Sequence, residues 1–272
     1  MFSLHHTAVF GCPRSGTTWL GQILNSAPSV QFRYQPLFSY EFKDWFGTSG
    51  VSEASLAEFQ TALMAAQSDF VLQPLRPAKT AASHLVWKEV RYHQLMAELL
   101  ALQGLHHLVY IFRPPVEVLN SWYQAPKEFR AGQDIHREWL HAPSKNTEPC
   151  EFNGFAKWKE SMCMALALQA RHPQKLLMLS YEQLCADPLR VSTALFQALG
   201  LRLGDETRAF LQASRSRHDT DAYSVFKSQR AALTLPAEIV RQIVADDEAT
   251  ELLARAEALA ACASGLELAA AQ

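Results

Sequence analysis

The segment GCPRSGTTW, near the start of the chain, has the residue types that bind a phosphate group. Gly11 and Gly16 are spaced as in the phosphate-binding loop G-x-x-x-x-G-K-[ST], where backbone N–H groups turn toward an anion. Thr17 stands where that loop has its lysine, and Thr18 takes the Ser/Thr position. Arg14 contributes a cation within the turn, so the sequence predicts an anion site whose charge comes from the loop itself.

The missing lysine argues against an ATPase or a kinase, because that lysine reaches the β- and γ-phosphates of a nucleoside triphosphate. Two later apolar runs, LVYIFR and LLMLSY, end in Arg113 and Tyr181 rather than in an aspartate that could hold magnesium. We therefore expect a site without a metal. A P-loop kinase or NTPase stays open as an alternative, and it predicts magnesium dependence.

A second cation follows another apolar run, in YIFRPPVEVLNSWY. Arg113 ends the run, Pro114 and Pro115 suit the first turn of a helix, and Ser121 lies two turns along it. Ligands of open α/β sheets bind beyond the carboxyl ends of the strands, so Arg14 and Arg113 should lie at one edge. Two such anion sites predict a ligand with two separated phosphate-type groups.

Apolar runs that alternate with helical patterns predict the framework that positions these residues. We expect strands at 6–11, 29–34, 83–90, 106–113 and 175–182, and helices at 17–24, 53–67, 92–103, 154–171, 188–200 and 237–260, with another after Pro115. This order predicts an α/β fold with a central parallel sheet flanked by helices, a three-layer sandwich like that of P-loop NTPases. We expect a single domain over 1–272, with a C-terminal helical part from about 188 and a surface loop at 142–154.

Composition limits the partners and the compartment. The chain has 25 Lys and Arg against 27 Asp and Glu, which gives no general affinity for nucleic acid or a membrane surface. Five scattered cysteines without a CxxC pair argue against a disulfide or zinc framework and favour a reducing, cytoplasmic location. The N-terminus lacks a basic region and a long apolar core, and no charge-free apolar run reaches about 18 residues. We expect neither a signal peptide nor a membrane span.

Together these motifs resemble those of sulfotransferases that use 3′-phosphoadenosine-5′-phosphosulfate (PAPS) and release 3′,5′-diphosphoadenosine (PAP). CPRSGTTWLGQIL looks like their 5′-phosphosulfate loop, FRPPVEVLNSWY like their 3′-phosphate element, and LLMLSYEQLCADP like a segment with a tyrosine near the adenine. WKEVRYHQL is similar to a Lys-x-x-Arg strand of carbohydrate-type members, and AYSVFKSQR to a basic segment that closes over the nucleotide. The resemblance runs from residue 8 to about 230 and is nearest in pattern to carbohydrate-type and bacterial members.

The resemblance implies transfer of a sulfuryl group from PAPS to a hydroxyl or amine of a small-molecule or carbohydrate acceptor, without a metal. The donor-binding residues that it implies are Arg14, Ser15, Gly16, Thr17, Thr18, Trp19, Arg113, Ser121, Tyr181, Lys227 and Arg230. Arg14 would also meet the charge that develops as the S–O bond breaks. Lys88 matches the lysine that steadies the transferring group in the family.

Two departures from the family pattern concern the loop after Arg113 and the general base. The family often has Arg-Asp-Pro where this chain has Arg113 followed by two prolines. Carbohydrate-type members carry Glu-Pro after their second strand, whereas this chain has Gln35 followed by Pro36. Because an amide cannot act as a general base, a non-catalytic nucleotide-binding relative also stays open as an alternative.

Three side chains are candidates for the missing base. Glu89 ranks first, because it ends the third strand at the donor edge while alternation points Lys88 to the other face. Glu41, on an expected helix, ranks second, and His93 ranks third. The alternative role for Glu89 is an ion pair with Arg91 that only orders the strand.

Aromatic and histidine side chains give weaker signals. Seven aromatic residues at 32–46 suit stacking on a sugar or enclosure of a phenolic or lipid acceptor, but for each of them packing in the core or against a helix is the favoured role. The histidine pairs at 5–6 and 106–107 flank predicted strands without a metal-ligand spacing. We expect them to be residues of the sheet edge.

Overall fold

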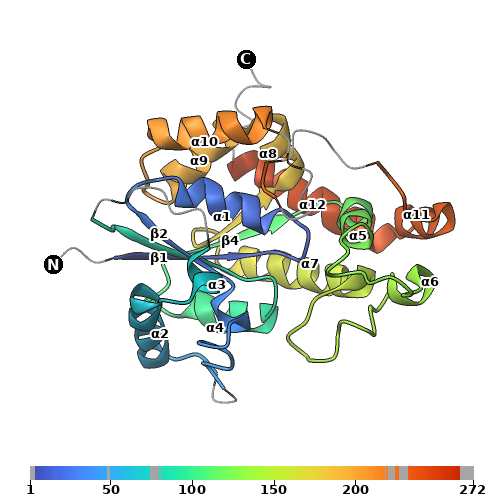
Figure 1. The fold of residues 1–272 in the computed structure, drawn as a ribbon, viewed down its shortest axis with the longest axis horizontal. Helices are drawn as coiled ribbons and strands as arrows, with labels where there is room; N and C mark the ends of the chain where they lie inside the picture. The colour runs from blue at the N-terminus through green and yellow to red at the C-terminus, as the bar shows by residue number, and fades with distance from the viewer. Residues whose placement is uncertain are drawn as a thin grey trace.

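A five-stranded parallel sheet forms the middle layer of the computed structural model, which describes residues 4–47, 50–73, 79, 81–217, 219, 224–226 and 232–263 (Figure 1). The strands are β1 (His5–Phe10), β2 (Val30–Tyr34), β3 (His84–Lys88), β4 (His107–Phe112) and β5 (Leu176–Ser180). They are ordered β2-β3-β1-β4-β5, and every neighbouring pair is parallel. The predicted α/β class with a central parallel sheet flanked by helices is therefore confirmed.

Helices connect these strands and cover both faces of the sheet. They are α1 (Thr17–Asn25), α2 (Glu53–Ala65), α3 (Asp69–Leu72), α4 (Met96–Ala101), α5 (Pro115–Tyr123), α6 (Ile135–Glu138), α7 (Gly154–Arg171), α8 (Tyr181–Ala186), α9 (Pro188–Ala198), α10 (Asp205–Ser216), α11 (Ala237–Val244) and α12 (Asp247–Ala263). Two short 3₁₀ helices, η1 (Pro36–Phe38) and η2 (His93–Leu95), follow β2 and β3. None of the helices described is both long and apolar enough to cross a membrane.

Two of the helices predicted for the framework differ from the structure, and α10 was not predicted. The segment expected to be helical at 92–103 begins as η2 and continues as the shorter α4, because Tyr92 has a left-handed backbone (φ 58°) just before it. The expected helix at 237–260 is two helices, since Asp246 accepts the N–H of Ala249 and starts α12 afresh. No helix was expected at α10, whose sequence DETRAFLQASRS is mostly polar.

Alternation along the buried strands divides the core into two clusters. Phe10, Trp87 and Tyr110 pack in one cluster with side chains of α2, α4, α7 and α12. Val86 and Val109 belong to the other cluster, with side chains of α1, α8, α9 and α10. Figure 1 shows α9 and α10 with α1 on one side of the sheet and α2 and α4 on the other. This arrangement is the expected three-layer sandwich.

The parallel register brings the residues that follow β1, β3 and β4 to one edge of the sheet. Val9 of β1 is paired with Lys88, the last residue of β3, and Phe10 is paired with Tyr110 of β4. The chain leaves β1 toward α1 on one face and β3 toward α4 on the opposite face. Ligands of open α/β sheets bind where connections diverge in this way.

Candidate active site

The loop between β1 and α1 requires both of its glycines. A Cβ atom on Gly11 would lie 2.3 Å from the carbonyl oxygen of Ile111, so the loop passes directly over the end of β4. Gly16 has φ 93°, and a Cβ there would lie 2.3 Å from the ring of Tyr181. Arg14 also has a left-handed backbone, with φ 71°. The loop leads into the N-terminus of the nine-residue helix α1, whose free N–H groups and dipole favour an anion.

Two buried donor atoms at this loop have no hydrogen-bond partner among the described residues. They are the hydroxyl oxygen of Ser15, a residue that is 1% exposed, and the indole Nε1 of Trp19. Native proteins rarely leave buried donors unpaired, because each costs about 1–3 kcal/mol. Ser15 in the loop and Trp19 in the first turn of α1 are placed to donate hydrogen bonds to an anionic ligand.

The side chain of Arg14 reaches α5 and the turn that follows it. Its Nε donates to the Ser121 hydroxyl at 3.1 Å, and its Nη1 donates to the Glu128 carboxylate at 3.1 Å. Glu128 lies in a turn fixed by its own N–H, which donates to the carbonyl of Ala125 at 2.8 Å. Ser121, predicted to bind a 3′-phosphate together with Arg113, thus lies within hydrogen-bond distance of Arg14.

Arg113 and Tyr181 form the other side of the loop. The Arg113 guanidinium lies 4.6 Å from the centroid of the Tyr181 ring, and its Nη1 donates to the carbonyl of Arg14 at 3.5 Å. The Tyr181 ring in turn meets the edge of Trp19, with 6.0 Å between ring centroids. The indole N–H of Trp158 holds the backbone of Arg113 by donating to its carbonyl at 3.0 Å. The two arginines predicted at separate strand ends are thus brought together.

Lys88 is a buried cation directed at the start of α1. Its side chain is 1% exposed, and its Nζ donates to the Thr17 hydroxyl at 3.3 Å and lies 4.2 Å from the centroid of the Tyr34 ring. Burial lowers the pKa of Lys88 to about 7, although the charges of Glu89 and Glu128 oppose that shift. An anion bound beside Thr17 would favour the protonated ammonium.

Glu89, the first-ranked base, is enclosed beneath the surface. It is 0% exposed, and its Oε1 accepts the N–H of Leu37 at 2.8 Å. Burial raises the pKa of the carboxyl to about 8, which keeps it largely protonated at neutral pH. The alternative ion pair with Arg91 is wrong, because Arg91 pairs with Glu151 at 3.0 Å. Through its hydrogen bond with Leu37, Glu89 fixes the position of the segment that follows β2.

The other two base candidates lie in different surroundings. Glu41 is exposed in turns beyond η1, so the helix expected there is wrong. Its charge acts on Arg33, whose Nε donates to the carbonyl of Leu63 on α2. His93 is 0% exposed, its Nδ1 is 2.8 Å from the Ser161 hydroxyl, and burial lowers its pKa to about 3.

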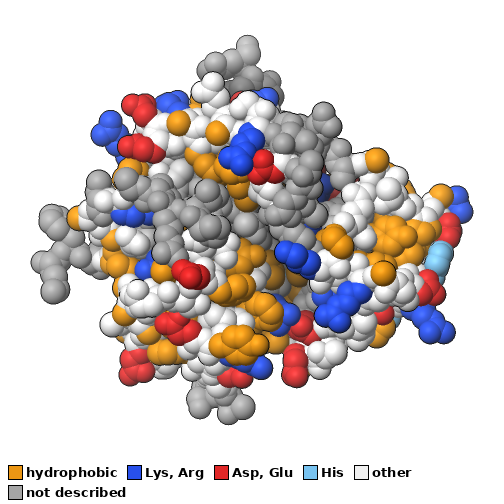
Figure 2. Space-filling model, viewed as in Figure 1, with side chains coloured by type: hydrophobic (Ala, Val, Ile, Leu, Met, Phe, Trp, Pro, Cys, Tyr) orange, Lys and Arg blue, Asp and Glu red, His pale blue; other side chains and the backbone are white. Residues whose placement is uncertain are grey.

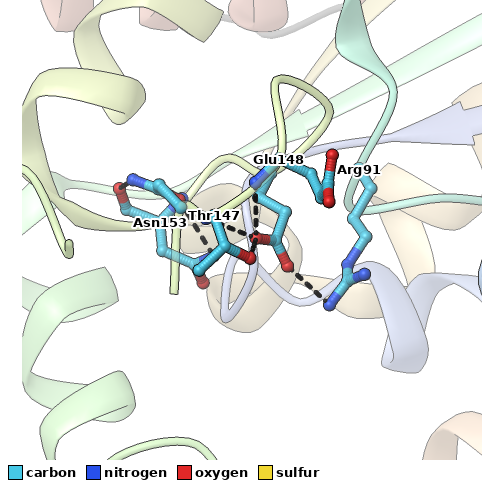
Figure 3. Close-up of polar contacts among 6 residues, drawn as sticks. Arg91, Thr147, Glu148 and Asn153 are labelled. Carbon is cyan, nitrogen blue, oxygen red and sulfur yellow. Dashed lines mark hydrogen bonds and ion pairs between the residues drawn. The ribbon is translucent and has the colours of Figure 1, made fainter. Parts of the chain in front are cut away.

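The segment predicted as a surface loop at 142–154 is tied to the end of β3. Glu151 is 6% exposed and accepts the N–H groups of Thr147 and Glu148 at 2.9 and 3.3 Å (Figure 3). The same carboxylate pairs with Arg91, and the N–H of Tyr92 donates to a carbonyl of this loop. The loop therefore orders the chain immediately after Lys88 and Glu89.

Exposed aromatic side chains continue outward from Tyr34. The centroid of the Phe70 ring lies 5.4 Å from the centroid of the Tyr34 ring, and the centroid of the Phe38 ring lies 5.9 Å from that of Phe70. Phe38 and Phe70 are 47% and 38% exposed, and the Arg91 guanidinium lies 4.0 Å from the centre of the Phe38 ring. Figure 2 shows hydrophobic side chains gathered around the middle of the face in view, beside several Lys and Arg side chains.

Tyr34 and Glu128 make contacts in this site that the sequence did not indicate. Tyr34 interacts with Thr18, and burial raises the pKa of its phenol. Glu128 joins the site through a contact between residues 114 positions apart, which leaves no local signal in the sequence. Lys227 and Arg230 lie outside the described residues.

The predicted sheet-edge histidines meet at the edge opposite this site. His5 lies 5.0 Å from His84 and 4.6 Å from His106, measured between ring centroids, and the N–H of His6 donates to Nδ1 of His106 at 3.1 Å. Within the described part of the chain, no group of three or more His, Cys, Asp or Glu side chains is arranged to hold a metal ion.

Solved structures with similar folds are sulfotransferases. A sulfotransferase from Alicyclobacillus acidocaldarius matches with 14% identity, a TM-score of 0.52 and coverage of 95% of this chain and 96% of that one. Sulfotransferase STF1 from Mycobacterium tuberculosis H37Rv matches with 16% identity, a TM-score of 0.50 and coverage of 90% and 77%. At these identities the likeness concerns the fold alone.

Sequence comparison gives the family. No curated protein sequence matches this chain significantly. The model of the sulfotransferase family matches residues 7–205, which include the loop after β1, Lys88, Arg113 and Tyr181. The chain therefore belongs to the sulfotransferase family.

Proposed function

We propose that this protein transfers a sulfuryl group from PAPS to a hydroxyl or amine of a small-molecule or carbohydrate acceptor and releases PAP. The observation that carries the proposal is the contact of Lys88 with Thr17. Thr17 occupies the position that carries lysine in the loop of P-loop NTPases, so here a lysine from the neighbouring strand brings the ammonium to that place. The P-loop kinase alternative is not favoured.

In this proposal the two ends of the donor are bound by different elements. The backbone N–H groups of residues 15–18, the Ser15 hydroxyl and the N-terminus of α1 bind the 5′-phosphosulfate. Arg113, with Ser121, binds the 3′-phosphate that distinguishes PAPS from ATP. Tyr181, held between Arg113 and Trp19, contacts the adenine. The contact of the Arg113 guanidinium with the Tyr181 ring supports binding of the 3′-phosphate and the adenine on the same side of the loop.

The bond that breaks joins sulfur to the bridging oxygen of the 5′-phosphate, and negative charge collects on that oxygen. Arg14, Lys88 and the Thr17 hydroxyl are fixed in place before the reaction, so they stabilise this charge without reorganising. The acceptor oxygen or nitrogen must approach sulfur opposite the leaving phosphate. The aromatic side chains of Tyr34, Phe70 and Phe38 would contact an acceptor with an apolar face.

An acceptor screen with sulfur-labelled PAPS in the presence of EDTA tests this function. The panel should contain phenols, aliphatic alcohols, amines and sugars, and label should pass to at least one class. Arg14→Ala should abolish that transfer while the far-UV circular dichroism spectrum is kept. Absence of transfer to every class, together with absence of PAP binding, contradicts the proposal.

A further inference from the structure

An alcohol acceptor must lose its proton as its oxygen bonds to sulfur, so a base is needed within hydrogen-bond reach. The amide of Gln35 cannot take that proton. Glu89 is sealed beneath the segment after β2, and His93 is enclosed against Ser161. Glu41 is exposed but acts on Arg33. None of these side chains is both exposed to solvent and close to the loop after β1.

Glu128 has both properties. Its side chain is 27% exposed, so an acceptor arriving from solvent can reach it. Its Oε1 lies 3.1 Å from Nη1 of Arg14, which ties the carboxylate to the loop that would bind the donor. Its charge also acts on Lys88 and raises the pKa of that ammonium, and it raises the pKa of the Tyr34 phenol. The carboxylate thus lies near the groups that surround Thr17.

The Arg14 guanidinium can bind the donor phosphate and the Glu128 carboxylate at the same time. A guanidinium carries five N–H donors in a planar fork, which lets it bridge two anions. Arg14 uses Nε for Ser121 and Nη1 for Glu128, on the side of the loop that faces α5. A donor phosphate bound by Arg14 would therefore lie next to Glu128.

We infer that Glu128 is the general base of the transfer, an inference that rests on the proposed function. The acceptor oxygen forms a bond to sulfur while the bond from sulfur to the bridging oxygen breaks. The electron pair of the broken bond stays on the 5′-phosphate of PAP. The acceptor proton passes to the Glu128 carboxylate and from there to water.

The test compares Glu128→Gln with the wild-type protein on two acceptors, an aliphatic alcohol and para-nitrophenol at a pH where that phenol is ionised. A lost general base lowers kcat by about 10²–10⁴-fold for the alcohol. An ionised phenol has already lost its proton, so its kcat should fall by less than about fivefold on the same principle. PAP affinity, measured by calorimetry, should stay within about threefold because Glu128 is not a donor ligand.

Two further variants complete the experiment. Glu251→Gln removes a carboxylate that also pairs with an arginine, Arg255 at 3.8 Å, but on the exposed surface of α12, and it should change neither rate. Glu128→Asp keeps a carboxylate and should restore part of the alcohol rate, which separates loss of the base from loss of folding.

The outcomes distinguish this inference from the function on which it rests. Equal losses for the alcohol and the phenolate overturn the inference, because they mean that Glu128 acts only through Arg14. A wild-type alcohol rate retained in Glu128→Gln also overturns it. If the wild-type protein neither binds PAP nor transfers label to any acceptor class, the proposed function fails and the inference fails with it.

Discussion

The ammonium of Lys88 on β3 donates a hydrogen bond of 3.3 Å to the hydroxyl of Thr17 on α1, across 71 positions of sequence. The parallel pairing of β1 with β3 produces this contact, because it sets the last residue of β3 beside Val9, near the end of β1. The loop after β1 therefore lies beside an ammonium group although it carries no lysine of its own. In the proposed function, this ammonium would offset the charge of the anionic donor at a loop that has threonine in the lysine position.

Lys88→Met tests the ammonium directly. Removal of one preorganised electrostatic donor lowers kcat by about 10²–10³-fold, and we expect a loss in that range. Met fills a similar volume without a buried charge, so the thermal unfolding midpoint should stay equal or rise. A kcat within twofold of the wild-type value would show that Lys88 serves only the fold.

The lowered pKa of Lys88 predicts proton uptake when an anion binds. At pH 7.5 a group with a pKa of about 7 is mostly neutral, and the charge of PAP should raise that pKa and draw in a proton. Calorimetry of PAP binding in buffers of different ionisation enthalpy measures this uptake. We expect uptake at pH 7.5, less of it at pH 6, and none of the Lys88 contribution in Lys88→Met. A binding enthalpy independent of the buffer contradicts the assignment.

Arg113→Ala should weaken PAP binding by tenfold or more and leave ADP binding nearly unchanged. A hydrogen bond to a charged group contributes about 1.5–3 kcal/mol, and ADP lacks the 3′-phosphate that would receive it. Titration of both nucleotides into the variant measures the difference. Equal losses for PAP and ADP would instead assign Arg113 to the 5′ side or to the stacking of Tyr181.

The histidine cluster predicts a loss of stability in mild acid. Burial lowers the pKa of His6 to about 4 and also lowers the pKa values of His84, His106 and His107. The unfolded chain then binds protons first as the pH falls below about 6.5, so stability is kept above that pH and lost toward pH 4.

Thermal unfolding as a function of pH measures this loss. We expect the midpoint to fall by about 5–10 °C between pH 7 and pH 5, since 1 kcal/mol moves it by about 2–4 °C in a domain of roughly this size. His106→Asn should flatten the profile, whereas His136→Asn, on the half-exposed His136, should leave its shape unchanged. A flat wild-type profile would rule out a contribution from the cluster.

The sheet could be predicted because its five strands are short apolar runs bounded by turn residues, and each was found within a few residues of its expected bounds. α10 could not be predicted, because only Thr207, Leu211 and Ser214 of that helix are buried and its pattern is that of a polar segment. The break between α11 and α12 depends on one aspartate cap that the apolar period does not reveal.

The residues of the candidate site also divide into those that the sequence indicates and those that only the fold brings together. Arg14, Gly16, Thr17 and Arg113 could be proposed as site residues from the sequence, because their spacing along the chain is itself the signal. The contact of Glu128 with Arg14 could not be predicted, because it comes from a turn after α5 that folds back on the loop, and nothing in the neighbouring residues marks it. The complete burial of Lys88 and Glu89 could not be predicted from the sequence either, because it depends on how the layers of the fold pack against each other.

Calorimetry of PAP and ADP binding to the wild-type protein in EDTA tests the central claim most directly. The account predicts that PAP binds with a dissociation constant of about 1 µM or better, equivalent to about −8.2 kcal/mol. It also predicts that ADP binds at least tenfold more weakly and that magnesium changes neither value. Equal affinity for PAP and ADP, or binding that requires magnesium, would contradict the assignment of this site to a PAPS-type donor.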